Sequence, residues 1–255
     1  MARQPKNNHR TEDTRLLIAP CDQSENFTDT DPWRVMRVMS EFVQGFDALA
    51  ELGPAVTIFG SARVKPDNPH YQQAVETARL LGEAGFNIIT GGGPGIMQAG
   101  NEGAKQANVT SVGLNIELPF EQHLNPFVDI AVDYRYFFVR KTMLVKYAQG
   151  FVIFPGGFGT MDELFEALTL VQTGKIQNFP IVLFDSSYWE GLLGWLRSTM
   201  LREGKVSASD LDLLIVADSP TEVRDIVVTA LQGKSDRAEK EAAVRAILQQ
   251  VYHGH

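Results

Sequence analysis

The sequence predicts an α/β protein with a Rossmann-like, doubly wound parallel sheet of about seven strands. A single domain is expected, with an extra N-terminal arm and helix, because 255 residues suit one domain of this class. Short apolar runs that are typical of buried strands alternate with amphipathic segments of helical spacing. Two glycine-rich loops follow such strands directly and lead into helices, as at the ligand-binding edge of an open α/β sheet.

The first 53 residues precede this sheet. Residues 1–30 are polar and are expected to form a flexible arm. Residues 31–53 are expected to form a helix with Asp31 as its N-cap and Pro32 as its first residue. Apolar residues recur at helical spacing from Val35 to Leu49, and Gly53-Pro54 ends the helix.

The main domain is expected over residues 54–233, and a C-terminal helix or tail over 234–255. The apolar runs predict strands at 56–59, 87–90, 110–116, 129–133, 151–154, 180–184 and 212–217. The segments between them predict helices at about 69–84, 95–107, 137–149, 160–173, 187–203 and 220–232.

The most informative segment runs from Pro155 to Glu163. It places Gly156, Gly157 and Gly159 between a buried strand and a helix that is expected to begin at Thr160. A helix N-terminus with flexible backbone before it is a favourable site for a phosphate or carboxylate. Glu163 is expected in the first turn of this helix. A carboxylate repels a phosphate, so Glu163 is not expected to bind one and is a candidate for chemistry on another part of the ligand. The alternative is structural, because Thr160 and Glu163 also fit a capping box.

Two further strand ends carry polar or glycine residues. The loop Gly91 to Gly95 follows the second strand, with Gly92 and Gly93 as candidate binding residues, and Gly60-Ser61 follows the first, with Arg63 nearby. Three such ends predict one polar anionic ligand held by several loops. Neither glycine loop fits G-x-G-x-x-G, and no P-loop motif is present in the sequence, which disfavours a dinucleotide dehydrogenase and a P-loop NTPase.

The signature Pro-Gly-Gly-x-Gly-Thr-x-x-Glu at 155–163 resembles that of the Lonely Guy family. Members are cytokinin-activating nucleoside 5′-monophosphate phosphoribohydrolases, often mislabelled lysine decarboxylases. The resemblance extends from about Val56 to Ala230 and includes Gly60-Ser61, the triple-glycine loop with Met97, and Arg140-Lys141. Gly-Ser-Ala-Arg at 60–63 and Gln98 depart from the usual pattern, which puts the preferred substrate in doubt more than the reaction.

The resemblance implies hydrolysis of the N-glycosidic bond of adenine-type nucleotides, cytokinin riboside monophosphates and/or AMP, to free base and ribose 5-phosphate. It implies Arg140 and Glu163 as catalytic residues in a nucleotide-binding domain, and a site shared in a homodimer or higher homo-oligomer. The substrate-binding residues would be Gly60, Ser61, Gly92, Gly93, Lys141, Gly156, Gly157, Gly159 and Thr160. No cofactor is expected.

The chemistry of the same residues is consistent with this. Cleavage of a ribosyl C–N bond develops oxocarbenium character, which an ionised Glu163 could stabilise, or Glu163 could activate the attacking water. Arg140 is a poor proton donor and is better suited to holding phosphate or orienting Glu163. The donor that protonates the leaving base stays open between Asp162 and water.

Three alternative interpretations remain at this point. Arg140 and Lys141 fit a solvated basic edge of an otherwise apolar helix. The chain also fits a non-catalytic nucleotide- or cofactor-binding carrier of the same fold, although the intact Arg140 and Glu163 favour hydrolysis. A pyridoxal-dependent decarboxylase is disfavoured, since no lysine of the sequence has a context that suggests a Schiff base.

Composition excludes several other classes. The net charge is −8 and no basic tract occurs, so a nucleic-acid surface is not expected. No apolar run approaches the ~18 residues of a membrane span, and the N-terminus is too polar for a signal peptide. The single cysteine, Cys21, suggests a reducing compartment, so a cytoplasmic location is expected. The five histidines are scattered, which indicates no metal site.

Overall fold

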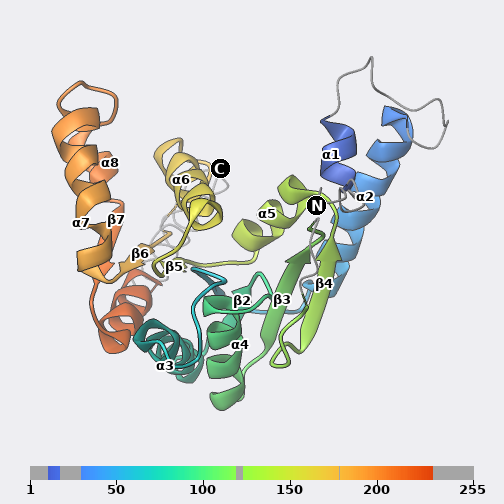
Figure 1. Ribbon diagram of the computed structural model, residues 1–255, viewed down its shortest axis with the longest axis horizontal. Coiled ribbons are helices and arrows are strands. Elements are labelled where there is room, and N and C mark those ends of the chain that lie inside the picture. The colour runs from blue at the N-terminus through green and yellow to red at the C-terminus, as the bar shows by residue number, and fades with distance from the viewer. Residues whose placement is uncertain (1–10, 18–29, 119–122, 178, 232–255) are drawn as a thin grey trace, which may run out of the picture.

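The computed structural model describes residues 11–17, 30–118, 123–177 and 179–231. Its centre is a sheet of seven parallel strands in the order β4-β3-β2-β1-β5-β6-β7 (Figure 1). The predicted fold class is therefore confirmed. The strands are β1 (Ala55–Phe59), β2 (Asn87–Thr90), β3 (Ser111–Ile116), β4 (Ile130–Tyr134), β5 (Phe151–Ile153), β6 (Ile181–Phe184) and β7 (Leu214–Ala217).

Helices cover both faces of the sheet (Figure 1). One face packs against α3 (Pro69–Glu83), α4 (Ile96–Gln106) and a helix that starts at Pro220 and is described to Leu231. The other packs against α2 (Asp31–Ala48), α5 (Phe137–Lys146), α6 (Phe158–Gln172) and α7 (Ser186–Trp195), which continues as a π-helix over Leu196–Leu201. A short α8 (Ala208–Leu211) precedes β7.

The central strands β1, β5 and β6 are mostly apolar because they are buried on both sides, whereas the edge strands β4 and β7 are partly exposed. Val56 and Ile58 of β1 belong to the core under α3 and α4, whereas Ala55 and Phe59 belong to the core under the other helices. All five residues of β1 are buried. This two-sided burial explains why the apolar runs located the strands to within two residues of their bounds.

Two predicted helix starts were wrong. Helix α6 begins at Phe158 after the N-cap Gly157, so Glu163 lies in its second turn. The capping-box alternative also fails, since no side-chain cap bond exists and the Thr160 N–H donates to the Gly157 carbonyl at 3.0 Å. The N-cap of α2 is Thr30 rather than Asp31. In both cases the residue that precedes the observed helix has the extended backbone of a cap.

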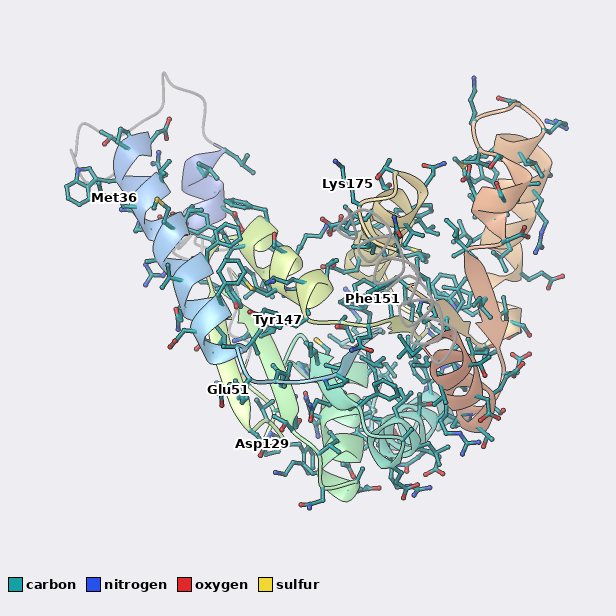
Figure 2. The ribbon with its side chains drawn as sticks, turned by 180° about the vertical axis from the view of Figure 1, so that it is seen from behind. Met36, Glu51, Asp129, Tyr147, Phe151 and Lys175 are labelled. Carbon is teal, nitrogen blue, oxygen red and sulfur yellow. The ribbon has the colours of Figure 1, made fainter. Side chains whose placement is uncertain are left out.

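The N-terminal region contains a helix that the sequence did not predict. This helix, α1 (Glu12–Leu16), lies within the expected arm and beside α5 and α2 (Figure 1). The remaining arm residues, the expected C-terminal helix at 234–255 and Cys21 lie outside the described residues. Helix α2 packs on α5 and β4 and exposes Met36, labelled in Figure 2, at the end of the molecule remote from α7. No helix of the described ranges is long and apolar enough to span a membrane.

Candidate active site

A pocket of about 790 Å³ lies at the carboxyl ends of the central strands. The loops after β1, β2 and β5 all contribute to it, and the strand order reverses between β1 and β5. Such a reversal leaves a crevice in which open α/β sheets bind their ligands. The pocket is lined by Phe59, Gly60, Ser61, Ala62, Arg63, Gly91, Met97, Ile116, Leu118, Phe137, Arg140, Gly156, Gly157, Phe158, Gly159, Thr160, Met161, Glu163 and Tyr188.

Backbone hydrogen bonds at Ser61 join the three loops. The Ser61 N–H donates to the Pro155 carbonyl at 3.1 Å, and the Ser61 carbonyl accepts from the Ile96 N–H at 3.1 Å. Gly95 makes this contact possible, because its φ is +69° and a Cβ there would clash with the Ser61 carbonyl. The three predicted strand ends are therefore one connected rim.

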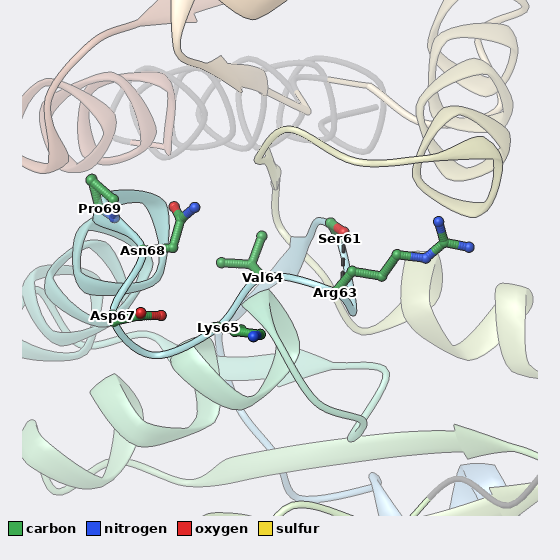
Figure 3. Close-up of a pocket in the computed structure, with 7 residues that line it drawn as sticks. All are labelled: Ser61, Arg63, Val64, Lys65, Asp67, Asn68 and Pro69. Atoms are coloured by element: carbon green, nitrogen blue, oxygen red, sulfur yellow. Dashed lines mark hydrogen bonds between the residues drawn. The ribbon is translucent and has the colours of Figure 1, made fainter.

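The loop after β1 brings a hydroxyl and a guanidinium to this rim. The Ser61 Oγ accepts from the Arg63 N–H at 3.1 Å, drawn as a dashed line in Figure 3, so the hydroxyl proton is left to donate to a ligand. The Arg63 side chain extends away from Asn68 and Pro69, towards the side of the loop that faces the pocket (Figure 3). Arg63 also borders a second, shallower hollow with Lys65 and Asn68.

The glycine loop after β5 leads into the first turn of α6. A Cβ at Gly156 would clash with the Thr160 side chain, so only glycine permits this close approach. The Tyr188 hydroxyl donates to the Gly156 carbonyl at 2.6 Å and fixes the loop from the side of α7. The first-turn amides of α6 and its helix dipole then face the pocket, which is the arrangement that binds anions.

Arg140 and Glu163 meet at the floor of the pocket. The Arg140 Nη2 lies 3.7 Å from the Glu163 Oε1, and their side chains are 14% and 4% exposed. Burial raises the pKa of Glu163 to about 7, although the Arg140 and Lys141 charges act to lower it. Burial also lowers the pKa of Arg140. No described residue hydrogen-bonds the Glu163 Oε2 or the Arg140 Nε, so each of these buried atoms has hydrogen-bonding capacity that the described contacts leave unused.

Lys141, a predicted substrate-binding residue, points elsewhere. Its Nζ lies 3.0 Å from Asp162 and 2.8 Å from Glu166, both on α6, and it is not among the pocket-lining residues. Burial acts to lower the pKa of Lys141, but hydrogen bonds to Glu166 and Asp162 raise it overall. Lys141 therefore ties α5 to α6 beside the pocket.

Gly92 and Gly93 are buried behind the pocket wall, where Gly91 is the residue that lines it. The Asn125 amide donates to the carbonyls of Gly92 and Gly93 at 3.0 and 3.1 Å, and to the Asn101 Oδ1 at 2.9 Å. Sequence reasoning missed this buried network. The sequence feature that could have indicated this network is Asn101, a polar residue on the glycine- and alanine-rich face of α4.

The remaining wall of the pocket is apolar. Phe59, Met97, Ile116, Leu118, Phe137 and Met161 line it, and the Phe137 ring centroid lies 5.4 Å from the Arg140 guanidinium carbon. Sequence reasoning did not assign this wall or Tyr188. Tyr188 follows β6, so applying the strand-end rule to that strand would have found it. Among the described residues, no three His, Cys, Asp or Glu side chains are grouped so that they could hold a metal ion.

Comparisons with known proteins agree with the sequence resemblance. A family model described as "possible lysine decarboxylase" matches residues 97–227. A cytokinin riboside 5′-monophosphate phosphoribohydrolase of Mycobacterium tuberculosis is 29% identical over 159 residues, which cover 60% of this chain and 84% of the relative. A probable enzyme of the same name from Oryza sativa subsp. japonica is 28% identical over 211 residues, covering 76% and 89%.

Solved structures show the same architecture. A molybdenum cofactor binding protein of Rippkaea orientalis has a TM-score of 0.51 at 21% identity, covering 70% of this chain and 97% of its own. The molybdenum cofactor carrier protein of Chlamydomonas reinhardtii has a TM-score of 0.52 at 21% identity, covering 70% and 98%. At this identity the likeness establishes the fold alone.

Proposed function

This chain belongs to the Lonely Guy family, described as "possible lysine decarboxylase", and from that membership we propose that it hydrolyses adenine-type nucleoside 5′-monophosphates. The substrates would be cytokinin riboside monophosphates and/or AMP, and the products the free base and ribose 5-phosphate. The observation that carries the proposal is the buried pair of Arg140 and Glu163 beside a helix N-terminus. Binding a phosphate alone needs no carboxylate at that place.

The pocket offers a distinct place for each part of a nucleotide. The first turn of α6 and the glycine loop would bind the 5′-phosphate, with the Ser61 hydroxyl as a further donor. The apolar wall that includes Phe137 and Met97 would take the base. The ribose would then lie between them, next to Glu163. Lys141 would act by holding α5 against α6.

The reaction would proceed by attack of water on C1′. As the C1′–N bond breaks, its electron pair moves to the base nitrogen, and the ribose gains oxocarbenium character that the Glu163 carboxylate stabilises. The attacking water gives a proton to Glu163, and the base takes up a proton in turn. The net change is the addition of one water across the glycosidic bond. Arg140 orients Glu163 and keeps part of it ionised at neutral pH.

The decarboxylase in the family description fits this pocket poorly. A pyridoxal enzyme needs a lysine amine at the reacting centre. The residues that line the pocket include no lysine, and Lys141 is ion-paired with Asp162 and Glu166. A hydrolase therefore fits the residues of this pocket better.

The test is chromatography of the purified chain incubated with AMP and, separately, with N6-isopentenyl-AMP. Wild type should release free base from at least one, and the ratio of rates ranks the two. Glu163→Gln should lower kcat/KM by at least about 100-fold, the usual scale for loss of a general base. Glu190→Gln, an exposed carboxylate on α7, should leave it unchanged.

The same samples test the alternative that the chain is a non-catalytic carrier of the same fold, as the name of the similar Chlamydomonas reinhardtii protein describes that protein. Calorimetry with AMP would show tight binding, no product, and little effect of Glu163→Gln if the chain were such a carrier. That result would refute the hydrolase. A homodimer or higher homo-oligomer is part of the proposal, and light scattering of the full chain tests it.

A further inference from the structure

Carboxylates from the N-terminal region cap helix α5, which carries Arg140. The N-cap of this helix, Tyr136, makes no side-chain cap bond. The Glu41 carboxylate on α2 instead accepts from the Arg135 N–H at 3.1 and 3.2 Å and from the Tyr136 N–H at 3.4 Å. The Asp13 Oδ2 on α1 accepts from the Phe137 N–H at 3.1 Å. Residues distant in sequence therefore satisfy the amides that begin α5.

Both carboxylates are held in surroundings that oppose their charge. Glu41 is only 6% exposed, and burial raises the pKa of both Glu41 and Asp13 while their backbone hydrogen bonds lower it. Burying a carboxylate is unfavourable unless hydrogen bonds and positive charge compensate. Here the compensation comes from the amides of Arg135, Tyr136 and Phe137 at the start of α5 and from the positive end of the α5 dipole. Because these carboxylates depend on the amides at the start of α5, the N-terminal helices and the start of α5 are held in a defined relative position.

A second set of contacts fastens the same end of α5. The Tyr136 hydroxyl donates to the Glu12 Oε2 at 3.2 Å, and the Arg37 guanidinium donates to the same oxygen at 3.3 Å. Tyr136 is fully buried. One residue of α5's cap thus joins α1 and α2, so both N-terminal helices converge on this helix start.

We propose that α1 and α2 form a positioning element that fixes the start of α5 and thereby sets Arg140 against Glu163, with Asp13 and Glu41 as its positioning residues. The Arg140 N–H donates to the Tyr136 carbonyl at 3.2 Å, so Arg140 belongs to the turn that these carboxylates cap. Fraying of that turn would displace the guanidinium from Glu163. The catalytic part of this inference rests on the proposed function.

The experiment compares Glu41→Gln and Asp13→Asn, singly and combined, with Asp47→Asn in the full chain. Asp47 is an exposed carboxylate on the same helix as Glu41, so it controls for the lost charge. Hydrogen exchange of amides 137–146 and carboxyl NMR of Glu163 are recorded for each variant. The charged groups that face Glu163 are Arg140 and Lys141 from α5, and Asp162 and Glu166 on α6.

The combined variant should accelerate exchange in the first turn of α5 by about tenfold, the effect of losing about 1.4 kcal/mol of cap stabilisation. It should also raise the pH at which Glu163 titrates, because the Arg140 charge that lowers its pKa would be displaced. Mere loss of a nearby negative charge would shift that titration in the opposite direction. With AMP as substrate, kcat should fall about tenfold with KM changed less than twofold.

Unchanged exchange and Glu163 titration, relative to Asp47→Asn, would overturn the positioning role. Faster exchange with an unmoved Glu163 titration would also overturn it, because the caps would then stabilise α5 without setting Arg140. If the wild type releases no free base, the proposed hydrolase fails. The exchange and NMR results would still decide whether α1 and α2 position Arg140.

Discussion

The Arg140 guanidinium lies 3.7 Å from the Glu163 carboxylate, an ion pair longer than a hydrogen bond. The two side chains come from α5 and α6 and are both largely buried at the pocket floor. Neither group saturates the other, since the Arg140 Nε and the Glu163 Oε2 have no hydrogen-bond partner among the described residues. The ionised form of Glu163 is therefore only partly compensated for its burial, and the free energy of unfolding should depend on its ionisation.

We predict that wild type loses stability relative to Glu163→Gln as the pH rises. Burial raises the pKa of Glu163 from 4.5 to about 7 in the folded protein. A raised carboxyl pKa contributes stability below the unfolded value, and this is lost as the pH rises through the folded value. Gln mimics the protonated form. The difference in unfolding free energy should change by up to about 3 kcal/mol between pH 4 and pH 8, at ~1.4 kcal/mol per pKa unit.

Urea denaturation of both proteins at several pH values measures this difference. Glu190→Gln should show no such pH dependence relative to wild type, because that side chain is exposed. A constant difference between wild type and Glu163→Gln across the range would mean that Glu163 titrates normally.

Much of this architecture was predictable from the sequence, for physical reasons. A strand buried on both faces is mostly apolar, so the five buried residues of β1 and the four of β6 stand out in the sequence as short, mainly apolar runs. The glycine loop was equally visible, because a Cβ at Gly156 would clash with Thr160. The rim of the pocket therefore followed from local sequence.

The features that sequence missed depend on tertiary contacts. Helix α1 has only five residues, too few to be stable alone, and Asp13 fastens it to α5 across more than a hundred residues of chain. The start of α6 was misplaced because Phe158, 96% exposed, gives no periodic signal. The ion pairs of Lys141 could not be predicted from sequence, because its two carboxylate partners on α6 are brought to it by helix packing.

We predict that Tyr188→Phe weakens nucleotide binding without unfolding the protein. The lost hydroxyl donates to the Gly156 carbonyl at 2.6 Å and holds the glycine loop. A net hydrogen bond of about 1 kcal/mol corresponds to a roughly fivefold rise in KM for AMP. Tyr147→Phe is the matched control, since that hydroxyl donates to the Phe46 carbonyl away from the pocket. Equal KM values for the two variants would exclude a role of Tyr188 in the loop.

We predict that Asn101→Ala destabilises the fold by about 2–4 kcal/mol, because it leaves several buried polar groups unpaired. The Asn101 side chain accepts from Thr90 and Asn125 and donates to Ser111 and to the Val112 carbonyl. Urea denaturation measures the change. Gln106→Ala, exposed on the same helix, should stay within about 0.5 kcal/mol of wild type. A similar small effect at Asn101 would show that its neighbours find other partners.

The last prediction separates folding from binding within the glycine loop. Gly156→Ala should destabilise the protein by about 1–3 kcal/mol, because its Cβ would clash with the Thr160 side chain, which is only 6% exposed and has little room to move. A Cβ at Gly159 meets no atom within 4 Å. Gly159→Ala should therefore keep wild-type stability, or gain up to about 1 kcal/mol from helix propensity in α6.

The two variants should differ in binding as well. If the phosphate lies on the first-turn amides of α6, the new methyl group of Gly159→Ala projects towards it, and KM for AMP should rise at least about tenfold in a protein that is fully folded. Thermal unfolding and steady-state kinetics on the same samples measure both effects. An unchanged KM for Gly159→Ala would place the phosphate away from this helix, because a bound anion within hydrogen-bond reach of those amides leaves no space for a methyl group.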